Sequence, residues 1–282
     1  MSDPDALHPE LVSDAVKRAL DEDCGAGDLT AELIPSEATV VADVLVREDI
    51  VLCGSDWFEE VFHQLDPGIQ LQWRARDGDA VSGGSRVCNL KGTARPILTG
   101  ERTALNFLQM LSGTATLTRE YVSAVAGTDV TILDTRKTIP GLRLAQKYAV
   151  RCGGGKNHRK GLYDAILIKE NHIAAAGGIA PAVSAARKHQ VLVEVEAETL
   201  KQVGDALDAG ADRILLDNFS TDQLLQAVQL RNSHSADQTK LEASGGIRIE
   251  GIREIAATGV DFISVGALTK NVVAADFSLR FL

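Results

Sequence analysis

The apolar positions along the chain change their pattern near residue 112. Before this point, apolar residues at helical spacing over residues 9–20 predict an amphipathic helix, with Pro9 suited to its first turn. A second, longer helical pattern covers residues 103–126. Between them, runs rich in β-branched residues, separated by Gly-containing turns, predict strands. These runs lie at residues 40–46, 50–53, 69–74 and 86–90. The pattern predicts a mixed α+β sandwich domain.

From residue 130 onward, short apolar runs alternate with helical patterns, as in chains that build parallel sheets from βα units. The apolar runs lie at residues 132–133, 165–168, 191–195, 214–216, 241–243 and 262–265. The helical patterns lie at residues 139–150, 199–207, 222–230 and 249–257. This alternation favours a parallel α/β barrel, incomplete with six to seven strands, and leaves a doubly wound open sheet as the alternative.

Polar residues follow the apolar runs directly. Because the carboxyl ends of barrel strands form one mouth, we expect these residues to line a site there. They are Asp134, Thr135, Arg136, Lys137, Lys169, Glu170, Asp217, Asn218, Ser244, Gly245, Gly246 and Gly266, with Glu194 and Glu196 on the strand between.

Charge makes one part of this mouth stand out. The chain has 282 residues and a formal net charge of −10, which argues against binding nucleic acid or an anionic membrane over its whole surface. Residues 134–172 nevertheless hold nine Lys and Arg residues against three acids, a net +6. Arg136, Lys137 and Lys169 sit at strand ends, where a bound anion explains a charge better than solvent does. A small polyanionic ligand is the expected partner.

Two kinds of loop offer phosphate-binding chemistry. The glycine-rich stretch at residues 153–159 lets backbone amides approach an anion and adds His158 and Arg159 as donors, although it lacks the ending of a Walker A loop. The stretches at residues 244–246 and 264–267 follow the last two strands, where barrels bind phosphate. A flexible connector is the alternative for the stretch at residues 153–159, and ordinary βα turns are the alternative for the two later stretches.

Acidic residues on two core strands add a possible metal site. Glu194 and Glu196 share a face of one strand, and Asp217 ends the next. Carboxylate oxygens suit Mg²⁺ shared with phosphates, whereas a salt bridge to Lys169 is the structural alternative.

The remaining features exclude other classes of protein. The four cysteines form no C-x-x-C pair, so we expect reduced thiols rather than a zinc site or disulfide framework. The N-terminal stretch MSDPDALHPE has no secretion-signal pattern, and no apolar run is long enough to cross a membrane. We therefore expect a cytoplasmic protein.

Several strings, taken together and in order, closely resemble one family, the quinolinate phosphoribosyltransferases, also called nicotinate-nucleotide pyrophosphorylases (carboxylating). They are EDCGAGDLT at residues 22–30, ERTALNFLQMLSGTAT at 101–116, LDTRKTIPGLR at 133–143, RCGGGKNHRKGLYDAILIKENHI at 151–173, VEVE at 193–196, LLDNF at 215–219, EASGGI at 242–247 and GVDFISVGALTK at 259–270. The departures that we note are conservative, such as Glu170 before Asn171 and His172, where Asp would also be expected.

The resemblance implies an N-terminal α/β sandwich domain over residues 1–112 and a barrel over 113–270, with a tail at 271–282 that returns to the first domain. It also implies a homodimer that converts quinolinate and phosphoribosyl pyrophosphate into nicotinate mononucleotide, pyrophosphate and CO₂, for NAD synthesis, with Mg²⁺.

The resemblance carries roles to particular residues. Catalysis would involve Lys137, Lys169, Glu196 and Asp217, with Mg²⁺ near the last two. The carboxylates and phosphates of the substrates would be bound by Thr135, Arg136, Lys137, His158, Arg159 and Lys169, and by Arg102 of the neighbouring subunit. The 5′-phosphate would bind at Ser244, Gly245, Gly246, Val265, Gly266 and Ala267.

Three rival functions remain open at this point. Lys169 at a strand end would suit a Schiff-base aldolase. A phosphate-ligand sensor without catalysis is a second possibility, and a related enzyme for another pyridine acid is the third.

Overall fold

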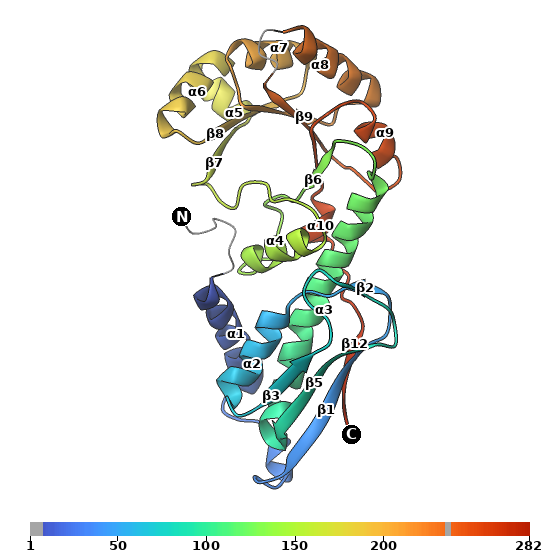
Figure 1. Ribbon diagram of the computed structural model, residues 1–282. Helices are drawn as coiled ribbons and strands as arrows, with labels where there is room; N and C mark the ends of the chain where they lie inside the picture. The colour runs from blue at the N-terminus through green and yellow to red at the C-terminus, as the bar shows by residue number, and fades with distance from the viewer. Residues whose placement is uncertain (1–7, 235–237) are drawn as a thin grey trace. The chain divides into compact units, whose positions relative to one another are not determined.

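The computed structural model describes residues 8–234 and 238–282, and these form two compact units (Figure 1). The first unit combines residues 1–119, 139–154 and 272–282, and the second combines residues 120–138 and 155–271. Residues 1–7, which contribute to the prediction that no secretion signal is present, lie outside the described residues. Each unit is thus assembled from separate stretches of chain.

The first unit is built on an antiparallel sheet of four strands, in the order β12-β1-β5-β3. The strand β1 lies at its centre and pairs with β5 on one side and with the C-terminal strand on the other, where Val46 faces Phe277. The bounds are β1 Thr39–Val46, β3 Gln70–Trp73, β5 Arg86–Thr93 and β12 Phe277–Phe281; a separate ribbon pairs β2 Ile50–Val51 with β4 Ala80–Val81.

Helices cover this sheet and complete the core of the first unit. Val16 of α1, Phe58 and Phe62 of α2 and Leu90 of β5 are all completely buried in one apolar cluster. The helix α4 joins the same cluster through Ala149. The bounds are α1 Pro9–Cys24, η1 Ala31–Leu33, α2 Ser55–Leu65, α3 Ala94–Ala124, of which residues 94–119 belong to this unit, and α4 Arg143–Cys152.

The compact units interleave more than the predicted boundary after residue 112 implies. The helix α4 was assigned by its position in the sequence to the barrel, but its buried face packs into the core of the first unit. Short-range patterns identify such a helix without showing which sheet it covers. That residues 1–112 and 113–270 fold as independent domains therefore remains a prediction.

The second unit contains a parallel sheet of six strands, in the order β6-β11-β10-β9-β8-β7. The first strand pairs with the last, as in a closed barrel, whereas β6 and β7 do not pair with each other. On the side of β6 that faces away from β11, Leu133 instead forms an isolated parallel bridge with Lys156, a residue outside the strands. The bounds are β6 Thr131–Leu133, β7 Ala165–Ile168, β8 Leu192–Ala197, β9 Arg213–Asp217, β10 Lys240–Ser244 and β11 Phe262–Ser264. The prediction of an incomplete barrel is confirmed, and the doubly wound alternative is wrong.

Helices α5 to α8 line the outer side of the curved sheet (Figure 1). Thr199 and Ser220 cap the helices α7 and α8. Each side-chain hydroxyl accepts a hydrogen bond from the third backbone amide of the helix that follows it. The bounds are α5 Glu170–Ala176, α6 Ile179–Ala186, η2 Arg187–His189, α7 Leu200–Asp208, α8 Thr221–Ser233, α9 Ile252–Ala256 and α10 Ala267–Lys270. In the described part of the chain, no helix is long and apolar enough to span a membrane.

Candidate functional site

The carboxyl ends of the six barrel strands meet at one edge of the second unit, because all neighbouring pairs run parallel. This edge brings together all but one of the residues expected in the site. From β6, the following loop, β7, β8, β9, β10 and β11 in turn they are Thr135, Arg136, Lys137, His158, Arg159, Lys169, Glu196, Asp217, Ser244, Gly245, Gly246, Val265, Gly266 and Ala267. Arg102 belongs to α3 in the first unit.

Arg136 and Arg159 bring two positive charges together at this edge. Burial, and then the positive charge of Arg136, lowers the pKa of Arg159. The Nε donor of Arg136 is buried and has no hydrogen-bond partner. Among the residues that the structure describes, neither guanidinium forms an ion pair with a carboxylate. Glu194 and Asp164 offset part of the charge of Arg159 from a distance, but neither forms an ion pair with it among the described residues. A planar carboxylate or a phosphate bound beside the two arginines fits their donors.

Asp134 anchors the glycine-rich stretch beside these arginines. This carboxylate is completely buried at the end of β6. One oxygen accepts from the backbone amide of His158 at 2.8 Å, and the other accepts from the side-chain amide of Asn157 at 2.7 Å. The sequence had placed Asp134 in the mouth without a role. Its role in the structure is to hold the loop that carries Arg159.

His158 is committed to contacts within the protein at both ring nitrogens. Its Nδ1 accepts from the backbone amide of Arg159 at 2.8 Å, so the ring proton lies on Nε2. This Nε2 lies 2.9 Å from Oε2 of Glu194 and 3.6 Å from Oε1 of Glu242. The ring thus connects the arginine-bearing loop to two carboxylates inside the barrel, and direct contact with substrate remains a prediction for this residue.

These two carboxylates form a buried acidic pair that is not fully compensated. Glu194 and Glu242 are 1% and 0% exposed. Arg213 is the neighbouring cation, with a guanidinium nitrogen 2.9 Å from Oε2 of Glu242. Burial, and then the charge of Glu194, raises the pKa of Glu242 to about 7; burial also raises the pKa of Glu194. The charges of Arg213 and Arg159 act in the opposite direction on Glu194, but burial outweighs them.

Glu196 and Asp217 lie nearer the mouth than this pair and keep oxygens that a cation can use. Glu196 is paired through Oε2 with the ammonium of Lys169, so the salt bridge considered from the sequence exists. Asp217 accepts from the side-chain amide of Asn218 through Oδ2, at 2.9 Å. Within the described ranges 8–234 and 238–282, no hydrogen bond engages the other oxygen of either carboxylate. A hard oxygen donor set of this kind fits Mg²⁺.

Lys137 is placed by a tight turn against the last barrel strand. Its amide donates to the hydroxyl of Thr135 at 3.1 Å, and its carbonyl accepts from the hydroxyl of Thr269 at 2.8 Å. A Cβ added to Gly266 would lie 3.1 Å from Cδ of Lys137. Glycine at this position therefore leaves room for the lysine stem, and the ammonium reaches the loop after β11.

Asn218 fixes the loop after β10. Asn218 itself has a positive φ of 58°, and its amide donates to the carbonyl of Ser244 at 2.9 Å. Gly245 has a φ of 102°, and a Cβ there would lie 2.2 Å from Oδ1 of Asn218. Only glycine satisfies both conditions. The Ser244 hydroxyl also accepts from Ser264 at 3.0 Å, which links the two late loops.

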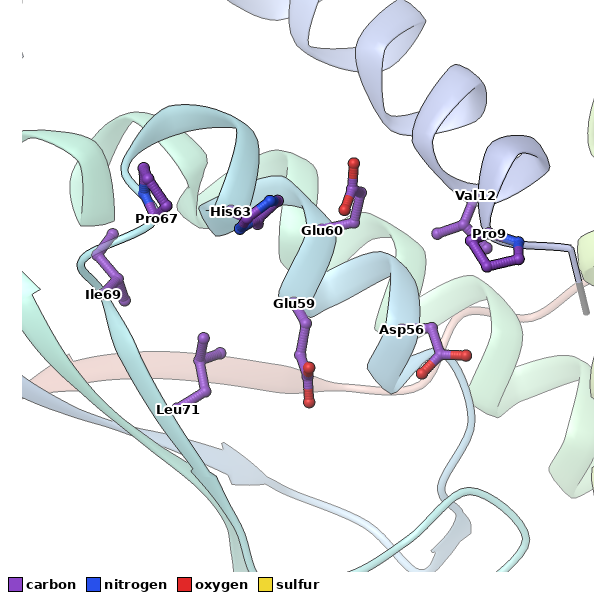
Figure 2. Close-up of a pocket in the computed structure, with 9 residues that line it drawn as sticks. All are labelled: Pro9, Val12, Asp56, Glu59, Glu60, His63, Pro67, Ile69 and Leu71. Carbon is purple, nitrogen blue, oxygen red and sulfur yellow. The ribbon is translucent and has the colours of Figure 1, made fainter.

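A separate pocket of about 500 Å³ lies in the first unit, and its chemistry differs from that of the barrel mouth (Figure 2). Three carboxylates of α2, those of Asp56, Glu59 and Glu60, contribute to its lining. Burial, followed by the charges of Asp77 and Glu59, raises the pKa of Asp56. An acidic lining repels anionic ligands, so the expected polyanion belongs at the barrel mouth and not in this pocket.

Comparison with known proteins identifies the relatives of this chain. A family model described as the quinolinate phosphoribosyl transferase N-terminal domain matches residues 28–112, and one described as the C-terminal domain matches residues 114–280. A probable nicotinate-nucleotide pyrophosphorylase (carboxylating) of Bacillus subtilis is 44% identical, over 92% of this chain and 89% of that protein. A chloroplastic nicotinate-nucleotide pyrophosphorylase (carboxylating) of Arabidopsis thaliana is 41% identical, over 97% of this chain and 84% of that protein.

The fold agrees with these matches. The solved structure of the nicotinate-nucleotide pyrophosphorylase from Francisella tularensis has a TM-score of 0.93 and 48% identity, over 99% of this chain and 98% of that one. The resemblance noted from the sequence motifs is confirmed along the whole chain. On the two family models and on these relatives, the chain belongs to the quinolinate phosphoribosyltransferase family.

Proposed function

We propose that this protein transfers the phosphoribosyl group of phosphoribosyl pyrophosphate to quinolinate and removes one carboxylate, giving nicotinate mononucleotide, pyrophosphate and CO₂. Relatives with over 40% identity are named for this reaction, as nicotinate-nucleotide pyrophosphorylases (carboxylating). The protein would then be a pentosyltransferase of NAD biosynthesis.

The arginine pair is the observation that carries this proposal. Quinolinate has two adjacent carboxylates on one aromatic ring, and Arg136 and Arg159 are neighbouring guanidiniums that, among the described residues, form no ion pair with a carboxylate. Paired N–H donors match a carboxylate edge, and the poor solvation of the partly buried arginines strengthens the attraction. Lys137 and Lys169 add charge for the second substrate.

The other strand ends suit phosphoribosyl pyrophosphate. Glu196 and Asp217 would hold Mg²⁺ together with the pyrophosphate oxygens, and the bound metal supplies charge neutralisation for the leaving group. The loops at residues 244–246 and 265–267, which Asn218 and the Ser244–Ser264 hydrogen bond hold in place, would receive the 5′-phosphate.

The chemistry then needs position and charge more than a protein nucleophile. The pyridine nitrogen of quinolinate attacks the anomeric carbon of the ribose as pyrophosphate leaves, and the ammonium groups of Lys137 and Lys169 offset the negative charge that develops. In the nucleotide that this attack forms, the positively charged pyridinium nitrogen withdraws electrons from the ring. The carboxylate on the neighbouring ring carbon therefore leaves as CO₂, and that carbon takes a proton to give nicotinate mononucleotide. The side chains orient the reactants throughout.

The direct test is formation of nicotinate mononucleotide, followed by absorbance with phosphoribosyl pyrophosphate and either quinolinate or nicotinate. We expect turnover with quinolinate and little or none with nicotinate, which lacks the second carboxylate for the arginine pair. Turnover with nicotinate alone would assign the site to another pyridine acid. A protein that binds both substrates without turnover would be a sensor. Trapping of a carbonyl substrate on Lys169 by borohydride would favour the aldolase.

We also propose a homodimer in which Arg102 completes the neighbouring subunit's site, and a cytoplasmic location. If sites are shared, inactive Arg102→Ala and Arg159→Ala chains should regain activity when mixed, because one site of each mixed dimer is free of both substitutions. The measurement is activity after unfolding and refolding the chains together, with mixed dimers verified by differently tagged chains. Verified mixed dimers without activity would instead require a site built from a single chain.

A further inference from the structure

Cys53 and Cys152 lie together in the first unit although 99 positions separate them in the sequence. Their sulfur atoms, with a carboxylate oxygen of Asp77, all lie within 4.8 Å of one another. Both thiols are free. The sequence spacing gives no sign of this pair, because the fold of the first unit is what brings α4 next to the segment after β2.

The backbone on both sides of the thiol pair is held firmly. The amide and carbonyl of Cys53 both bond to the hydroxyl of Ser112, at 3.0 Å and 3.1 Å. The carbonyl of Cys152 accepts from Arg119 at 3.3 Å. A Cβ on the next residue, Gly153, would lie 2.4 Å from the carbonyl oxygen of Ala115. The juxtaposition of the sulfurs is therefore part of the packed fold.

The two thiols are in different environments. Cys53 is completely buried, whereas Cys152 is partly exposed at the end of α4. A hydrogen bond from Cys53 lowers the pKa of the Cys152 thiol, to which the Tyr148 hydroxyl also contributes. Burial raises the pKa of Cys53 well above its usual value. Cys152 is thus the nucleophile of the pair, and Cys53 the second thiol held beside it.

A metal site explains the cluster of Cys53, Asp77 and Cys152 less well. The carboxylate of Asp77 already accepts three hydrogen bonds: from the amide of Gly54 at 2.9 Å, from the amide of Ser55 at 3.2 Å and from the hydroxyl of Tyr148 at 3.0 Å. These bonds hold the start of α2 and leave the carboxylate satisfied within the protein. Two thiols alone make an incomplete set of ligands for Zn²⁺, which takes four.

We propose that Cys53 and Cys152 are a thiol–disulfide modification site, which hydrogen peroxide oxidises to an intramolecular disulfide. The Cys152 thiolate attacks one peroxide oxygen and becomes a sulfenic acid, and the other oxygen leaves as hydroxide. The sulfur of Cys53 then attacks the sulfenic sulfur, and water leaves. In total, two thiols and one peroxide give one disulfide and two water molecules.

The disulfide would act on the stability of the first unit and on the chain that leads into the barrel mouth. It closes a loop of about 100 residues, a length at which a cross-link strongly restricts the unfolded chain. It also ties down the residue just before the glycine-rich stretch at residues 153–159. A disulfide of this kind in a reducing compartment is reversible and reports oxidant rather than serving as a permanent brace.

The test compares the full-length protein before and after treatment with hydrogen peroxide. Under denaturing conditions, the number of reactive thiols should fall from four to two, and peptide mapping should join residues 53 and 152. The midpoint of thermal unfolding should rise, and a dithiol reductant should restore both values.

Variants separate this pair from the other thiols. Cys24→Ser is the matched control and should still lose two thiols, whereas Cys53→Ser and Cys152→Ser should form no intramolecular disulfide. Cys152→Ser should also lose the rapid reaction with peroxide. The proposal is overturned if the mapped disulfide involves Cys24 or Cys88, or if all four thiols remain reactive after peroxide treatment. It is also overturned if a chelator releases one bound metal per chain and makes Cys53 and Cys152 reactive again, because a metal would then have protected them from the thiol reagent.

Discussion

Replacing Arg136 by alanine is expected to raise the KM for quinolinate by roughly 10- to 100-fold, because a hydrogen bond to a charged group contributes about 1.5–3 kcal/mol. The KM for phosphoribosyl pyrophosphate should change less, since Lys137, Lys169 and the late loops remain. Arg136→Lys should fall in between, because an ammonium keeps the charge and loses the planar pair of donors. Steady-state kinetics with each substrate varied in turn measure both constants.

The matched control is Arg76→Ala, which removes an exposed arginine of the first unit and should leave both constants unchanged. A single effect of equal size on both substrates would mean that Arg136 supports the fold of the site and not the quinolinate subsite. Unchanged constants would remove Arg136 from the site altogether and would count against the arginine pair as the binding feature.

Glu242→Gln is expected to stabilise the protein at alkaline pH relative to the unaltered chain and to leave it nearly unchanged near pH 5. Because burial raises the pKa of Glu242 to about 7, the folded protein holds a proton there that the unfolded chain has released. Stability is therefore present at low pH and is lost as pH rises through the pKa of the folded state. Glutamine stays neutral at every pH and avoids this loss.

The full difference is at most about 3–4 kcal/mol, the value that corresponds to moving this pKa from its usual range to about 7. The groups that act on the Glu242 carboxylate are Glu194, His158, Arg213 and Ser264. A glutamine oxygen at this position can still accept from the guanidinium of Arg213. The measurement is the midpoint of thermal unfolding of both proteins at pH 5, 6, 7 and 8. The exposed control Glu254→Gln should give a curve parallel to that of the unaltered chain, and a parallel curve for Glu242→Gln would contradict the prediction.

The barrel was more predictable from the sequence than the first unit. Its strands are buried on both faces and separated by helices, so each appears as a short apolar run, and all six were found within a few residues. Sheet order was not in the pattern. It follows from the pairing of β6 with β11 and from the gap beside β7, which depend on contacts between segments far apart in the chain.

The first unit has features that no local pattern reveals. No helix was predicted at α2, although the buried residues Trp57, Phe58 and Val61 lie at helical spacing there. The helix begins only two residues after the predicted strand at residues 50–53 and is short. The helix α3 begins at Ala94, nine residues before the predicted start. The strand β12 was expected only as a tail that returns to the first domain. In the structure it pairs with β1, a strand that lies far away in the sequence.

At the site, the charged groups at strand ends were identified from the sequence more readily than the buried groups that hold them in place. Arg136, Lys137 and Lys169 stood out as charges at strand ends. Glu242 lies inside the string EASGGI and alternates with apolar neighbours, and this was the one signal that could have marked it as an inward-facing acid. Asp134 gave no such signal, because its partners are amides more than twenty positions away.

The pairing of β12 with β1 has a consequence for how the protein is made. A ribosome completes β1 at Val46 and begins β12 only at Phe277, more than 200 residues later. Until β12 has been made, β1 presents an open sheet edge, which promotes pairing with other nascent chains. The order of synthesis thus makes one edge of β1 dependent on a strand made much later, and a premature stop before residue 277 would leave that edge exposed.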